Sequence, residues 1–281
     1  MKKIKVSVQV KDFDIVDLNN LGSHNVTMSN VIVRSAQTLS LIEKRILMAC
    51  ISKMKDRTVK LSATEYANTY NVDLKNAYQH LKDGSTNLFN RYLSVNVKDG
   101  KSIGVMRIRW LSTSGYFDGE GYVTMGFAPE IMPHLINLKG QFTQYQLKQA
   151  ADLRSLHTWR LLELLEQMRN DQPEGYLLIS ITDFHHAMEA SESYKTNFSL
   201  LRQYVIEPAI KELNEKDGWA IEYIPLKRGR KVAALRFDFV KNKQMSLIQQ
   251  DDPSLKNAIP RLASPKALPI HQFDENNWKP A

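Results

Sequence analysis

The chain has 281 residues, enough for two domains with separate cores, and its 43% hydrophobic content is ordinary for a globular protein. Lys and Arg number 38 against 30 Asp and Glu, so the net charge of +8 favours an anionic partner. The single cysteine, Cys50, excludes an intrachain disulfide, and its place on an apolar helix face predicts a buried side chain. No apolar run approaches the roughly 20 residues needed to cross a bilayer, and the lysine-rich start lacks a signal peptide's apolar region. We therefore expect a cytoplasmic protein that makes no membrane contact.

The first structural unit is predicted to follow an N-terminal tail, residues 1–26. A helix is predicted at 39–55, and the short strand "TVKL" comes after it. Ser62 with an acid three residues later, Glu65, indicates a capping box at the start of a short helix. A longer third helix and a β-hairpin close the unit. The expected bounds are 63–71 for the short helix, 74–90 for the third helix and Asp99-Gly100 for the hairpin turn. A later alternating segment, "GYFDGEGYV" at 115–123, is better explained by another hairpin turn than by a metal site.

The second unit has the same order of predicted elements. A helix at 152–169 leads to the strand "YLLISI", and Ser180 with Asp183 predicts the next cap. A short helix at 181–189 and a long third helix at 194–215 follow. The last hairpin turns at "PLKRGRK".

Three pairs of segments show that the two units are similar in sequence. "LSATEYA" matches "ISITDFH" at an offset of 179 − 61 = 118, and "KNAYQHLK" matches "KTNFSLLR" at 195 − 75 = 120. "RILMACISKM" and "RLLELLEQM" match at 160 − 45 = 115. The order of elements is that of a winged helix. The sequence thus predicts an α+β fold of two tandem winged-helix (helix-turn-helix) domains related by internal duplication, at 27–140 and 141–241, with 242–281 as a flexible C-terminal tail.

The second domain offers the stronger candidate site for double-stranded DNA. The third helix of a winged helix enters the major groove, while the hairpin, or wing, follows the phosphate backbone. A solvated polar face would be the better explanation for an isolated helix of this composition, but "KRGRK" places four cations at the neighbouring hairpin tip. Residues 193–241 contain ten Lys and Arg and six Asp and Glu, a balance of 10 − 6 = +4. The predicted DNA contacts are Tyr194, Lys195, Asn197, Ser199, Arg202, Lys227, Arg228, Arg230 and Lys231.

The first domain carries the same parts with fewer cations. Its third helix also presents His80 and Asp83, so the domain is expected either to bind DNA less tightly or to serve chiefly as a subunit interface. Its candidate contacts are Lys75, Asn76, Gln79 and Lys82 on the helix and Lys98 and Lys101 on the hairpin.

An enzyme, a DNA nickase or primase, is the least favoured interpretation. The nearest match to a metal-binding His-apolar-His pair is His185 beside His186, and adjacent helical side chains diverge by about 100°. No Gly-x-x-x-x-Gly-Lys-Ser/Thr phosphate loop occurs. We expect no catalytic site, no metal and no cofactor.

A proline lies inside the predicted third helix of the second domain. An interior proline removes a hydrogen bond and clashes with the carbonyl four residues back, which costs about 3 kcal/mol. Pro208 therefore predicts a bend near Glu207, with the front half of the helix in DNA and the rear half on the wing.

Three segments resemble the iteron-binding plasmid replication initiators of the Rep-3, or RepB-like, family. They are "SNVIVRSAQTLSLIEKRILMACIS", "FTQYQLKQAADLRSLHTWRLLELL" and "NFSLLRQYVIEPAIKELNE", and the resemblance extends over about residues 29–240. It implies two winged-helix domains and binding, as a monomer, to the direct repeats (iterons) of a plasmid origin. It also implies that a dimer binds an operator inverted repeat and represses the protein's own gene. The implied partners are the host replication initiator and the replicative helicase. By analogy the second domain makes the main base contacts and the first carries the dimer interface. A winged-helix repressor without an initiation role remains the alternative.

Overall fold

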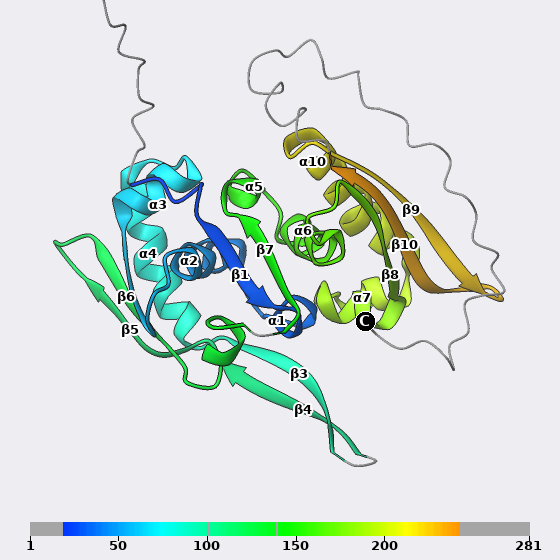
Figure 1. Ribbon diagram of the computed structural model, residues 1–281, viewed down its shortest axis with the longest axis horizontal. Coiled ribbons are helices and arrows are strands. Elements are labelled where there is room, and N and C mark those ends of the chain that lie inside the picture. The colour runs from blue at the N-terminus through cyan, green and yellow to red at the C-terminus, as the bar shows by residue number, and fades with distance from the viewer. Residues whose placement is uncertain (1–18, 100–101, 139, 242–281) are drawn as a thin grey trace, which may run out of the picture.

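The fold is described from a computed structural model, which defines residues 19–99, 102–138 and 140–241. The two predicted tails, apart from residues 19–26, and Lys101 lie outside the described residues. Figure 1 shows two units side by side along the longest axis, with α2 to α4 in one and α7 to α10 in the other. The first unit is preceded by β1 (Asn25–Ser29) and α1 (Asn30–Arg34).

The first winged-helix domain begins as the sequence predicts. Its helices are α2 (Leu41–Ser52), α3 (Ala63–Tyr70) and α4 (Leu74–Phe89), and the strand between the first two is β2 (Thr58–Ser62). Ser62 and Glu65 form the expected capping box, and Ser40 and Glu43 form a further one at α2. Helix α4 packs closely on α2 at Gly84, where a Cβ atom would collide with the side chain of Ile46.

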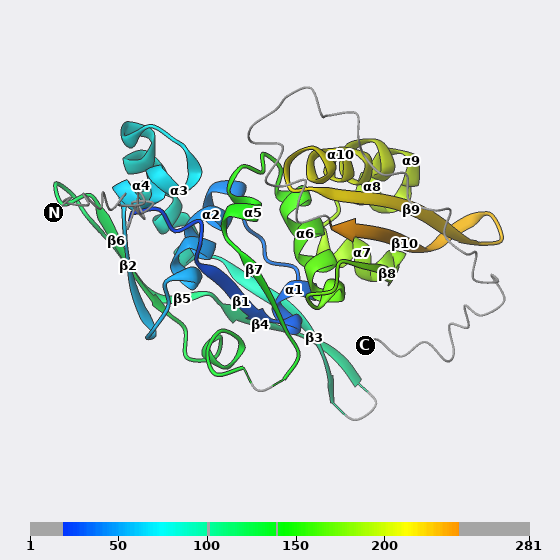
Figure 2. The ribbon, with the colours of Figure 1, turned by 45° about the horizontal axis from the view of Figure 1, so that its top comes forward.

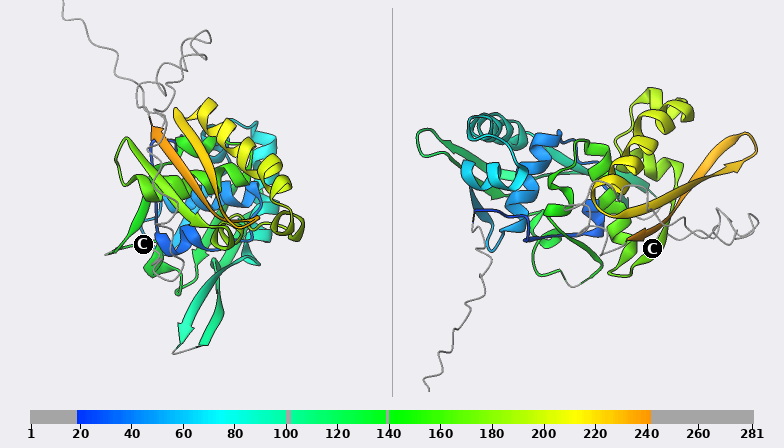
Figure 3. Two further views of the ribbon diagram at one scale, coloured as in Figure 1. Left: turned by 90° about the vertical axis from the view of Figure 1, so that its right-hand side faces the viewer. Right: turned by 90° about the horizontal axis from the view of Figure 1, so that it is seen from above.

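The wing of the first domain is not the hairpin that the sequence indicated. The predicted hairpin exists as β3 (Tyr92–Asp99) and β4 (Ser102–Arg109), but it forms a separate two-stranded sheet. The three-stranded sheet has the order β2-β6-β5, so the wing is the next hairpin, β5 (Leu111–Phe117) with β6 (Tyr122–Phe127). This wing contains the "GYFDGEGYV" turn. The β3–β4 ribbon is therefore an insertion, which projects from the body of the molecule (Figures 1 and 3).

A connecting region joins the two domains. It consists of a short 3₁₀ helix (Met132–His134), β7 (Phe142–Gln146) and α5 (Lys148–Ala151). Strand β7 pairs antiparallel with β1, so residues on either side of the expected 140/141 boundary share one small sheet.

The second domain repeats the arrangement of the first. Its sheet order, β8-β10-β9, corresponds to β2-β6-β5, which confirms the two winged-helix domains predicted from the repeat. Ser180 accepts a hydrogen bond from Asp183 N at 3.0 Å, as the cap prediction requires. The elements are α6 (Leu156–Arg169), β8 (Glu174–Ser180), α7 (Ile181–Ala187), α8 (Glu192–Thr196), α9 (Phe198–Leu201), a π-helical turn (Arg202–Ile206), α10 (Glu207–Lys216), β9 (Trp219–Arg228) and β10 (Lys231–Lys241).

The predicted single helix at 194–215 is wrong in its start. Asn197 has an extended backbone, with φ −127° and ψ 98°, and separates α8 from α9. Its side-chain oxygen accepts hydrogen bonds from the backbone N–H groups of Ser199 and Leu200, so it acts as the N-cap of the third helix. Leu201, Val205, Ala209 and Leu213 are buried along one face, at helical spacing, but this spacing does not show that a capping residue interrupts the segment.

A buried ionic cluster connects α2 with α6 where the domains meet. Lys44 Nζ and Arg160 Nη1 each lie 2.6 Å from the Glu163 carboxylate, and all three side chains are at most 2% exposed. Arg160 also donates to the backbone oxygens of Val33 and Ser35. Burial lowers the pKa of Lys44 to about 8. Burial also acts to raise the pKa of Glu163, but the charges and hydrogen bonds of Lys44 and Arg160 outweigh it and keep that pKa below its usual value. A buried charge that loses its partner is costly, so this cluster stabilises the position of α2 relative to α6.

Candidate nucleic-acid interface

The exposed face of the third helix of the second domain begins at the Asn197 cap. Leu201 and Val205 are buried, whereas Ser199 and Arg202 are exposed. The Arg202 side chain is half exposed and its Nε lies 3.5 Å from the Glu207 carboxylate. Pairs of this kind between exposed groups are weak, so the guanidinium remains available to a base edge.

Two of the predicted contacts lie on the preceding short helix, α8. Lys195 is exposed and its Nζ is 2.6 Å from a Glu192 carboxylate oxygen. Tyr194 is partly buried and packs on the hydrophobic core. The Asn197 amide oxygen is occupied by its capping bonds, which leaves only its NH₂ group for a ligand.

The wing of the second domain ends in a two-residue turn, Gly229-Arg230, and Arg228 pairs with Lys231 across it. Gly229 has φ +61°, a conformation that favours glycine and is typical of the first position of a type II′ hairpin turn. The strands extend further than the sequence suggested, so three of the four cations stand on strand ends beside the turn. The exposed side chains of Lys227, Arg230 and Lys231 have no ion-pair partner in the described parts of the chain.

Sequence reasoning missed two exposed residues in the π-helical turn. Gln203 and Tyr204 both point outward, and Tyr204 is 56% exposed. Tyr204 falls between the buried residues Leu201 and Val205. An aromatic residue at a position outside the buried face of the helix was the signal in the sequence that could have identified it.

The polar face of α4 in the first domain is tied to acidic side chains. Asn76 donates to Asp73, Gln79 Nε2 donates to Asp83 at 2.6 Å, and Lys82 lies 3.6 Å from Asp118. Lys75 is exposed. Helix α4 thus has fewer exposed cations without an acidic partner in the described structure than the wing of the second domain has.

The true wing of the first domain is acidic, because Asp118 and Glu120 lie at its turn. Lys98 instead belongs to strand β3 of the inserted ribbon. The ribbon also carries Arg107 and Arg109, both exposed and both missed from the sequence, where "MRIRW" alternates them with apolar residues. Phosphate contacts from this domain would therefore come from the ribbon rather than from the wing.

Helices α4 and α9 face the same side of the molecule. In Figure 2, where the top of the molecule comes forward, both lie toward the upper side, with α4 toward one end of the long axis and α9 toward the other. The right-hand view of Figure 3 agrees with this placement. One extended partner could therefore contact both helices.

The adjacent histidines of α7, His185 and His186, have different surroundings. His186 Nε2 accepts a hydrogen bond from the Ala36 N–H at 3.3 Å, and burial lowers the pKa of His185. Across residues 19–99, 102–138 and 140–241, no three His, Cys, Asp or Glu side chains gather closely enough to hold a metal ion. In the same part of the chain no helix has the length and apolar character of a membrane span.

Two family models of DNA-replication proteins, one for each winged-helix domain, match this chain. The family model described as "Initiator Replication protein, WH1" matches residues 25–166, and "Initiator Rep protein, WH2" matches residues 180–239. The chain therefore belongs to the initiator replication protein family, as its resemblance predicted.

Its relatives include two Escherichia coli proteins. A replication initiation protein is 24% identical over 236 residues, which cover 80% of this chain and 72% of that protein. The PI protein is 23% identical over 255 residues, covering 79% and 81%. A crystal structure of the Pi initiator protein in complex with iteron DNA matches with a TM-score of 0.68 at 20% identity, over 79% of this chain and 99% of that one. This likeness supports the fold.

Proposed function

We propose that this protein initiates plasmid replication by binding the direct repeats of the origin as a monomer. The observation that carries the proposal is that Lys227, Arg230 and Lys231 on the wing are exposed, with no ion-pair partner among the described residues, in the same domain as the exposed Ser199 and Arg202 of the third helix. Family membership supports it, as does the fold shared with a Pi initiator that was crystallised with iteron DNA.

In the proposed complex the two parts of the second domain have different tasks. Arg202 and Ser199 read base edges in the major groove, because they occupy the first turns of the helix. The wing cations neutralise phosphates and supply affinity without sequence preference. The first domain adds backbone contacts through α4 and the ribbon, including Lys75, Lys98 and Lys101. By family analogy we also propose a dimer that represses the protein's own gene, and contacts with the host initiator and helicase.

The test is footprinting of the purified protein on DNA flanking its gene, followed by anisotropy titration of the protected repeat. Arg202→Ala should cost about 1–3 kcal/mol on the repeat and change binding to a scrambled duplex little. Unchanged relative affinity for the repeat and the scrambled duplex would refute the assignment of the recognition helix.

Permanganate reactivity of an adjacent AT-rich segment separates an initiator, which opens it, from a repressor, which leaves it paired. Supercoiled origin DNA should stay uncut with Mg²⁺ or Mn²⁺ alone, whereas a nickase would relax it.

A further inference from the structure

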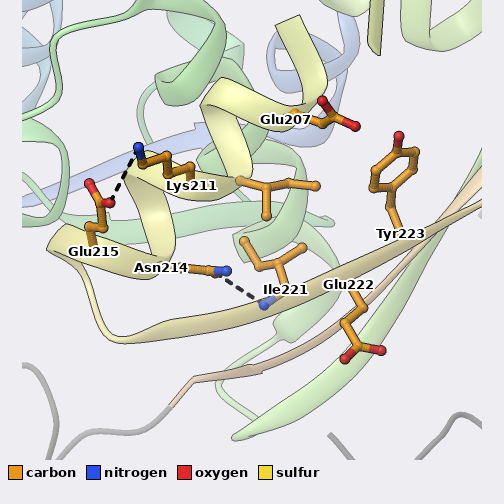
Figure 4. A pocket seen from close by; sticks show the side chains of 8 residues that line it. Glu207, Lys211, Asn214, Glu215, Ile221, Glu222 and Tyr223 are labelled. Atoms are coloured by element: carbon orange, nitrogen blue, oxygen red, sulfur yellow. Dashed lines mark hydrogen bonds and ion pairs between the residues drawn. The ribbon is translucent and has the colours of Figure 1, made fainter. Parts of the chain in front are cut away.

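A groove between helix α10 and strand β9 differs in charge from the rest of the second domain. Its volume is about 360 Å³, and Ile210, Ile221 and Tyr223 supply its apolar lining. Glu207, Glu215 and Glu222 lie around it with a single cation, Lys211 (Figure 4). The groove residues therefore sum to 1 − 3 = −2, in a domain segment whose balance is +4.

Of the six acids in residues 193–241, the three groove carboxylates are the least tightly paired in the described structure. Glu212, Asp217 and Asp238 each contact a lysine or arginine within 2.9 Å. In the groove, by contrast, Glu207 lies 3.5 Å from Arg202 and Glu215 lies 3.9 Å from Lys211, while Glu222 is exposed without a charged partner. Such a rim repels phosphate, so DNA does not fit this surface.

Strand β9 is an edge strand, because the sheet order is β8-β10-β9. The Asn214 side chain accepts a hydrogen bond from the Ile221 N–H at 3.1 Å, which caps one edge position from the α10 side. Ile221 and Tyr223 lie two residues apart and so face the same way along the strand. An aromatic residue beside apolar side chains, between a helix and an edge strand, is a recurring peptide-docking geometry.

The chain itself carries a segment of opposite charge. Residues 253–270, "PSLKNAIPRLASPKALPI", hold Lys256, Arg261 and Lys266 and no acid, among regularly placed apolar residues and prolines. The described structure ends at Lys241, which pairs with Trp219, two residues before Ile221 of the groove. Eleven residues, 242–252, separate Lys241 from this segment, and a chain of that length can span at most about 36–40 Å. The groove begins about 7 Å along β9 from the point where the tail leaves, well within reach.

We propose that the basic C-terminal segment 253–270 docks in the α10–β9 groove of its own chain. Apolar side chains of the segment contact Ile210, Ile221 and Tyr223, and its cations lie among the groove carboxylates. The covalent connection raises the local concentration of the segment, so a weak contact suffices for occupancy. This inference goes beyond the proposed DNA function and does not rest on it.

Disulfide trapping in the full chain tests the docking. Lys211→Cys in the groove is combined with Ala263→Cys in the tail, and the rate of intramolecular disulfide formation is followed by gel mobility at low protein concentration. The control pair places the first cysteine at Glu174, which is exposed and lies opposite Val240 across the sheet, equally close to the start of the tail but outside the groove. Cys50 is buried, with a pKa raised to about 12, so it does not compete.

The groove pair should close about tenfold faster than the control pair. Glu207→Gln with Glu215→Gln, or 0.5 M NaCl, should remove the difference, because the attraction depends on the rim charges. Equal rates for the two pairs in low salt would overturn the proposal, as would a rate advantage that survives neutralisation of the rim. Disulfide-linked dimers in place of the intramolecular product would also overturn it and assign the groove to the tail of a second copy.

Discussion

Removal of cations from the wing of the second domain should reduce the salt dependence of DNA binding, by an amount set by the number of cations removed. In the described parts of the chain, Lys227, Arg230 and Lys231 are exposed and have no ion-pair partner, so each is free to neutralise a phosphate. Each phosphate contact contributes about 0.9 to the slope of log K against log salt concentration. Arg230→Gln with Lys231→Gln should therefore lower the slope by about 1.8. Between 50 and 200 mM salt, the variant should lose about twelvefold less affinity than the unaltered protein.

The assay is fluorescence anisotropy with a labelled origin duplex and a scrambled duplex over a series of salt concentrations. Arg230→Gln alone should give half the change, and both duplexes should be affected alike because the wing contacts no bases. Lys211→Gln is the matched control, since Lys211 is exposed but lies beside Glu215 in the acidic groove. A double variant that keeps the original slope, or a control that lowers it equally, would refute the wing assignment.

Three further predictions concern the stability of the fold, measured by urea denaturation. Asn197→Ala should cost about 1 kcal/mol because it removes the N-cap, whereas Asn197→Asp should retain most of the stability; equal stability of both variants would contradict the capping role. Glu163→Gln should cost about 3–5 kcal/mol because it leaves Lys44 and Arg160 buried without their carboxylate, and a loss below 1 kcal/mol would show that the cluster is not buried in solution. The pKa of Lys44 falls from 10.5 to about 8 on folding, so its contribution to the free energy of unfolding should rise with pH between these values. The buried Cys50 thiol, with its pKa raised from 9.0 to about 12, contributes in the opposite direction above about pH 9. The measured quantity is therefore the difference between the unaltered protein and Lys44→Met, which should grow with pH from about 8 in favour of the unaltered protein; a difference that does not change with pH would contradict the shift.

The sequence predicted the elements well wherever the signal was local. The Ser62–Glu65 capping box and the helix predicted at 74–90, found as Leu74–Phe89, each depend on residues a few positions apart, and both appear as expected. The first wing was misassigned because alternation and the Asp99-Gly100 dipeptide do identify a hairpin, but not the sheet that it joins. The partner of β2 is β6, some sixty residues further along the chain, and no local pattern specifies that pairing.

The candidate site shows the same division between local and distant information. The positive charge of the "KRGRK" wing could be predicted from the sequence. The contacts of Gln79 with Asp83 and of Lys82 with Asp118 could not, because they depend on side-chain geometry and, for Lys82, on a hairpin distant in the sequence. The Asn197 cap was also missed, because asparagine serves both as a base-reading residue and as a helix cap. The extended backbone at Asn197 and the hydrogen bonds that its side chain accepts show the capping role here.

Pro208 provides a last prediction, because the structure changes the energetic argument about it. The segment is not one regular α-helix: a π-helical turn, Arg202–Ile206, precedes α10, and the Glu207 N–H bonds to the Arg202 carbonyl five residues back. Pro208 thereby falls in the first turn of α10, where a missing N–H and a fixed φ are well tolerated. Pro208→Ala should then destabilise the protein by about 0.4–1 kcal/mol through the entropy of the unfolded chain. Relief of an interior proline would instead stabilise it by about 3 kcal/mol. Urea denaturation beside the exposed control Lys211→Ala distinguishes the two by sign, and a stabilised Pro208→Ala variant would show that the π-helical turn does not accommodate the ring.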